Sequence, residues 1–103
     1  MGLGELTIET VKPLVGTSFR LSLPDGRTTE VKLDEALSYD VRQRRQRTAP
    51  KRQPFSLFFV GDPSIVLEQG MYTLSSEAAT WEGVFLVPIG RDEEATDYEA
   101  VFT

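Results

Sequence analysis

The chain has 103 residues, of which 40% are apolar and 26% are charged, and its formal net charge is −5. That length suits one modest core, so we expect residues 1–103 to form a single domain. The chain contains no cysteine and no histidine. Disulfides, thiolate metal sites and thiol nucleophiles are therefore excluded, and the commonest general base and transition-metal ligand are missing.

The first expected element is a short helical segment between Leu6 and Gly16. Ile8 and Val11 follow helical spacing, and Gly16 is a suitable residue to end a helix. Pro13 is tolerated only in the first turn of a helix, so the segment is limited to a turn or two. We expect this segment to cover one end of a core.

A β-hairpin is expected next. Phe19, Leu21 and Leu23 alternate with polar residues, and a second alternating run covers 28–33. Between them lies Pro-Asp-Gly-Arg at 24–27, in which proline presets φ and glycine supplies a positive φ. Alternation on both sides of such a turn predicts two antiparallel strands with one buried face.

Four further strands are predicted from apolar or alternating runs. They lie at about 55–60, 71–74, 84–89 and 98–102. Pro88 marks a strand end, an edge or a bulge, because proline cannot donate to a ladder. About six strands without a sustained helical period predict an all-β fold, an antiparallel meander that forms a small barrel or a two-sheet sandwich.

The predicted core consists of inward-facing side chains from all six strands. Trp81 lies in a Thr-Trp-Glu-Gly sequence between two predicted strands, and two interpretations are open: an exposed anchor, or a plug over the end of the barrel. The other expected core residues are Phe19, Leu21, Val31, Leu33, Leu57, Phe59, Tyr72, Leu74, Leu86 and Phe102.

The least ordinary feature of the sequence is a basic segment at 42–52. It holds six of the eleven lysines and arginines and no acidic residue: Arg42, Arg44, Arg45, Arg47, Lys51 and Arg52. Residues 53–103, by contrast, hold nine acidic residues and one arginine. Because the segment lacks apolar periodicity and ends in prolines, we expect residues 42–53 to be an exposed, mobile loop.

The six basic side chains are the candidate partner-binding residues. Arginine favours charge-assisted, bidentate contacts with carboxylates, so an acidic protein surface is the partner we expect first. Nucleic acid is a second partner class, but the acidic remainder of the chain would repel a phosphate backbone from most directions. A third interpretation is a solvated loop that rests on acidic residues of its own domain.

Catalytic and cofactor motifs are scarce. A serine nucleophile would need a lysine base, and neither Lys32 nor Lys51 is in a segment expected to be desolvated. The acidic run at 92–99 lacks the order and glycine of an EF-hand loop, and no phosphate-binding loop is present. We therefore expect no enzymatic activity, no cofactor and no metal site.

The apolar runs are too short for a membrane span, and residues 1–9 lack the basic start of a signal peptide. We expect a soluble, cytoplasmic protein without a membrane partner.

The strand motifs resemble a family of uncharacterised bacterial domains of about a hundred residues. The resemblance is carried by LVG at 14–16 with Phe19, PFSLFFVG at 54–61, LEQGMYTL at 67–74, FLVPIG at 85–90 and YEAVF at 98–102. It implies a domain often encoded near proteins with phage-tail-collar domains of the microcystin-dependent type. No catalytic or binding residue is implied, because the family has no established activity. The sequence departs from the family in the length and basicity of the segment 42–52.

Together these observations favour a non-enzymatic structural or protein-binding accessory module, associated through the resemblance with a phage-tail-like or tail-fibre-like assembly. The alternatives are a nucleic-acid-binding small barrel that uses the basic segment and a small-ligand-binding barrel.

Overall fold

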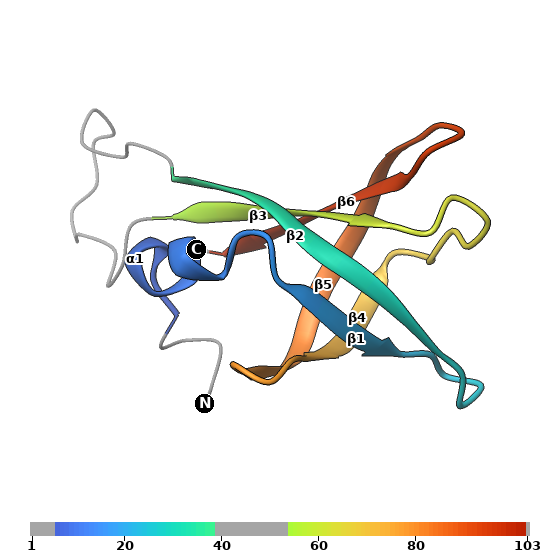
Figure 1. Cartoon of the computed structure of the whole chain (residues 1–103), viewed down its shortest axis with the longest axis horizontal. Coiled ribbons are helices and arrows are strands. Elements are labelled where there is room, and N and C mark those ends of the chain that lie inside the picture. Colours follow the sequence, from blue (N-terminus) through green and yellow to red (C-terminus); the bar gives the residue numbers. More distant parts are fainter. Residues whose placement is uncertain (1–5, 39–53, 103) are drawn as a thin grey trace.

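The structure is a computed structural model that describes residues 6–38 and 54–102. Its described residues form a closed barrel of six antiparallel strands with a short helical segment at one end (Figure 1). The strands are β1 (Ser18–Ser22), β2 (Thr28–Ser38), β3 (Phe55–Gly61), β4 (Gly70–Ser75), β5 (Thr80–Arg91) and β6 (Thr96–Phe102). The all-β prediction is thus confirmed, and the barrel is the alternative that the chain adopts.

The strand order around the barrel is β1-β2-β3-β6-β5-β4. Strands β1 to β3 form one antiparallel meander and β4 to β6 form a second, so the order departs from a single meander at the step from β3 to β4. Residues 62–69 join these two strands across one end of the barrel (Figure 1). The Tyr98 hydroxyl holds this connection, because it accepts from the Leu67 N–H at 2.9 Å and donates to the Ile65 carbonyl at 3.3 Å.

The β1–β2 hairpin forms as its sequence predicts. The Leu23 N–H donates to the Arg27 carbonyl, and the Asp25 carboxylate accepts from the Arg27 backbone N–H at 3.0 Å. Gly26 has a φ of +91°, a conformation that favours glycine in this turn. In the register that follows, Phe19 lies opposite Val31, and both are buried.

The predicted N-terminal helical segment is confirmed as α1 (Ile8–Val11) followed by the 3₁₀ turn η2 (Lys12–Leu14). Thr7 caps α1 and exchanges hydrogen bonds with Thr10 in a capping box. Figure 1 shows α1 at the end of the barrel where β2 finishes. Ile8 and Val11 are buried in the same core as the strands, so the helix covers this end as expected.

Strands β5 and β6 are paired over only part of their length. The ladder between β5 and β6 runs from Arg91 opposite Thr96 only as far as Val87 opposite Glu99. Beyond that point the last residues of β6 pair with β3 alone. The register shifts between Pro88 and Gly90, which confirms the predicted irregularity at the proline.

Nine of the ten expected core residues are buried, and Tyr72 is half-buried. Tyr72 lies near the barrel end, and its hydroxyl reaches out to donate to the Glu68 carbonyl at 2.6 Å. Burial is the main cause that raises the pKa of this phenol above 10.0. Trp81 is part of β5 rather than of a connection, and its side chain is fully buried, so the exposed-anchor interpretation is wrong.

Candidate functional site

The six basic residues predicted as a partner site lie outside the described residues. The range 39–53 contains all six of them: Arg42, Arg44, Arg45, Arg47, Lys51 and Arg52. The loop expected at 42–53 lies in the same range. Their role as a binding site therefore stays a prediction. The structure does show the two strands that bracket them.

The segment is bracketed by the last residue of β2 and the first residue of β3. Ser38 and Phe55 are partners in the β2–β3 ladder, at the end of the barrel where α1 lies (Figure 1). On the outer face here, Leu37 and Val101 are exposed on either side of Ser56. The Ser56 hydroxyl is buried and donates to the Glu99 carboxylate at 2.9 Å. The outer face at this end of the barrel therefore carries both apolar and polar groups.

The described residues carry a strong negative balance. They include fourteen acidic and five basic side chains, so the basic segment and the barrel have opposite charge. Among the described residues, the ion pair between Arg27 and Asp25, at 2.7 Å, is formed within one turn. This balance is compatible with both an acidic partner for the segment and contact of the segment with its own barrel.

The interior of the barrel is filled by the protein's own aromatic side chains. Phe19 stacks on Trp81 with ring centroids 4.7 Å apart, and it meets Phe59 edge-on at 6.2 Å. At the α1 end, Phe55 stacks on Phe102 at 4.9 Å. Six-stranded barrels are narrow enough for side chains to fill them, and this barrel follows that rule.

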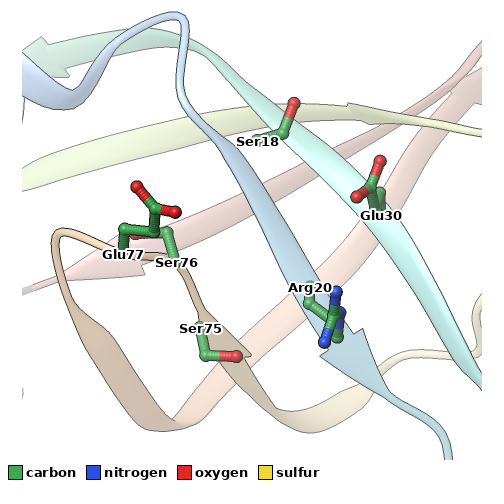
Figure 2. A pocket seen from close by; sticks show the side chains of 6 residues that line it. All are labelled: Ser18, Arg20, Glu30, Ser75, Ser76 and Glu77. Carbon is green, nitrogen blue, oxygen red and sulfur yellow. The ribbon is translucent and has the colours of Figure 1, made fainter.

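A surface hollow of about 360 Å³ lies over the seam between β1 and β4. The β1–β4 ladder is short and includes Arg20 opposite Ser75; on its other side, Arg20 faces Glu30 of β2. Figure 2 shows the side chains around the hollow; they are Ser18, Arg20, Glu30, Ser75, Ser76 and Glu77. One guanidinium, three hydroxyls and two carboxylates make a polar, mixed-charge surface. The sequence analysis missed this cluster because only the strand register brings its members together.

Three aspartates lie in the turns at the barrel end opposite α1 (Figure 1). The pKa of Asp25 is lowered below 3.8 mainly by the backbone N–H of Arg27, which donates to its carboxylate. The pKa of Asp62 is lowered below 3.8 mainly by the backbone N–H of Ser64. The pKa of Asp92 is lowered chiefly by the backbone N–H groups of Ala95 and Glu94, which donate at 2.9 and 2.8 Å. These carboxylates stabilise turns, which is a structural role.

Residues 6–38 and 54–102 contain no cluster of three or more acidic residues arranged to hold a metal ion. No helix in these ranges has the length and hydrophobicity needed to cross a membrane.

Comparison with known families gives one match. The family described as Domain of unknown function (DUF6916) matches residues 6–102, which is nearly the whole chain. The chain belongs to this family. No curated protein and no solved structure matches the chain. The predicted bacterial origin and the predicted neighbouring tail-collar proteins stay predictions.

Proposed function

We propose that this DUF6916 protein is a non-enzymatic structural or protein-binding accessory module. Its partner is an acidic protein surface, which the segment 42–52 contacts through its five arginines and one lysine. The setting we propose is a phage-tail-like or tail-fibre-like assembly, on the resemblance alone, and a cytoplasmic location likewise stays a prediction.

The observation that carries the proposal is the filled interior of the barrel. Phe19, Phe59 and Trp81 occupy the space in which a larger barrel would hold a ligand. Recognition then belongs to the outer surface and to the connections. The connection between β2 and β3 has the highest density of cations in the chain, and cations steer association with an oppositely charged partner.

Defined probes test the proposal. One probe is a fluorescent peptide rich in glutamate, and the other is a single-stranded oligonucleotide of equal charge. We compare the wild type with a variant in which all six basic residues are replaced by glutamine. Measurements at about 0.1 M and about 1 M salt span screening lengths of about 10 and 3 Å.

We expect the wild type to bind the acidic peptide, with affinity that falls as salt rises, and the glutamine variant to lose this binding. Equal binding by both proteins would contradict the proposal. Preference for the oligonucleotide with a steep salt slope would favour the nucleic-acid alternative. A variant that loses folding stability instead would show that the segment neutralises its own barrel.

The surface hollow supports one alternative function, binding of a small polar molecule. Arg20 would hold an anionic group, and Glu30 and Glu77 would favour a cationic group, so a zwitterionic compound fits the lining best. Titration of Arg20→Gln and wild type with a panel of free amino acids, followed by amide chemical shifts, tests this alternative. Shifts that Arg20→Gln abolishes would support it.

A further inference from the structure

The outer face of β5 is apolar where a solvent-facing strand is ordinarily polar. Val84 and Leu86 point into the core, whereas Phe85, Val87 and Ile89 point outwards. Phe85 is 43% exposed and Ile89 is 51% exposed. Met71 of β4, which is 73% exposed, lies directly opposite Phe85 in the ladder. We call the four outward residues the β5 stripe.

A run of apolar residues on both faces of a strand is typical of a strand that is covered on both sides. The inner face of β5 is covered by the barrel core, whereas on the outer face Phe85 and Ile89 are exposed and Val87 is half-buried. Scattered exposed apolar residues are ordinary, whereas adjacent ones on one face mark an interaction surface. From Phe85 to Ile89 the stripe is about 13 Å long at the rise of a β-strand.

The charges around the stripe are acidic. Glu82 is exposed on β5, and Asp97 of β6 lies opposite Gly90 in the ladder. Glu99, opposite Val87, adds a carboxylate that already accepts a hydrogen bond from Ser56. Arg91, the single basic residue of β5, donates its Nε–H to the Pro63 carbonyl at 2.9 Å and so turns toward the 62–69 connection.

We propose that the β5 stripe is a docking surface for a partner protein whose contact region has an apolar centre and lysine or arginine at its rim. The apolar centre covers Phe85, Val87, Ile89 and Met71, and the cations face Glu82 and Asp97. A second copy of this chain fits less well, since a symmetric dimer through this face would bring the acidic rims together. This surface is distinct from the segment 42–52, so the inference goes beyond the proposed function and does not depend on it.

The test uses a blocked nonapeptide in which valine and lysine alternate, with a matched peptide that carries glutamate instead of lysine. The full-length protein, labelled with ¹⁵N, is titrated with each peptide, and backbone amide shifts are followed. We expect shifts that cluster on the β5 stripe with the lysine peptide and none with the glutamate peptide. Equal shifts from both peptides, or shifts elsewhere, would overturn the proposal.

Substitutions locate the binding surface. In the triple variant Phe85→Thr, Val87→Thr, Ile89→Thr, which keeps strand-favouring side chains, we expect affinity for the lysine peptide to fall at least tenfold. The control is Val15→Thr, which changes a side chain of similar exposure (42%) outside the strands and should keep full affinity. If the triple variant does not fold, Met71→Thr replaces it, with a smaller loss expected. Unchanged affinity in both stripe variants would contradict the proposal.

Two other occupants of the stripe are distinguished in the same experiment. Shifts of stripe residues that grow with protein concentration alone would indicate a second copy and would overturn the proposal. Binding of the lysine peptide that appears only when the six basic residues of 42–52 are replaced by glutamine would indicate that this segment occupies the stripe. That outcome would also overturn the proposal that a partner protein docks on the stripe.

Discussion

Phe19 of β1 and Trp81 of β5 stack inside the barrel, with ring centroids 4.7 Å apart and ring planes 28° apart. The two strands are not neighbours, because β4 lies between them in the sheet. The contact therefore joins the two strands that flank β4 through the interior. It also occupies space that a ligand would otherwise need.

A double-mutant cycle tests this contact. Phe19→Leu and Trp81→Leu are compared with the double variant by urea unfolding. Stacked aromatic pairs contribute about 0.5–1.5 kcal/mol beyond their buried area, so we expect a coupling energy in that range. Strictly additive losses would contradict the stacked arrangement.

The core of β3 gives a second prediction. Leu57 and Phe59 are fully buried, so replacing either by alanine leaves a cavity and is expected to cost about 2–5 kcal/mol of unfolding free energy. Lys32→Ala, on the exposed face of the adjacent β2, serves as the control and should change little. A denaturant midpoint that neither core substitution moves would refute the core assignment.

A third prediction concerns the connection across the barrel end. In Tyr98→Phe the buried Leu67 N–H loses its acceptor, which is expected to cost about 1–3 kcal/mol of unfolding free energy. Tyr72→Phe is the matched control, since the Glu68 carbonyl that it releases lies in an exposed residue and can accept from water. Equal losses in the two variants, measured by urea unfolding, would show that Tyr98 does not anchor the connection.

The pH dependence of stability gives a fourth prediction. The folded pKa of Asp92 lies below its ordinary value of 3.8, because backbone N–H groups of the turn favour the carboxylate. Its contribution is therefore fully present above the unfolded pKa and is lost as the pH falls through the folded pKa. Thermal unfolding between about pH 5 and pH 2 should show a smaller acid loss for Asp92→Asn than for the wild type. A wild-type acid loss that Asp92→Asn leaves unchanged would refute this role.

The strands and the first helix could be predicted from the sequence, because alternation, helical spacing and turn residues depend only on residues that are neighbours in the chain. Alternation around Pro-Asp-Gly determined the β1–β2 hairpin, and Pro13 limited the first helix to one turn plus a 3₁₀ turn. The pairing of β3 with β6, and of β4 with β1, depends on contacts between residues far apart in the chain. No local pattern encodes that choice, so the sequence left the barrel and the sandwich open.

The candidate binding surfaces also differ in whether their residues are close together in the chain or are brought together only by the fold. The basic segment is visible in the sequence because its six cations lie within eleven residues of the chain. The hollow of Arg20, Glu30 and Ser75 needs the strand register, which periodicity does not supply. The sequence predicts β5 as a strand because its residues are apolar on both faces. Only the folded barrel shows which of the two faces is exposed to solvent.

Capture from the native cell tests whether the protein acts by binding another protein through the segment 42–52. Tagged wild type and the variant with six glutamines are used on lysate with and without nuclease treatment, and retained proteins are quantified by mass spectrometry. The account predicts a small set of proteins with acidic surfaces that the wild type retains at low salt and the variant does not, while both proteins unfold at the same denaturant midpoint. Identical sets from the two proteins, or sets that disappear after nuclease treatment, would contradict it.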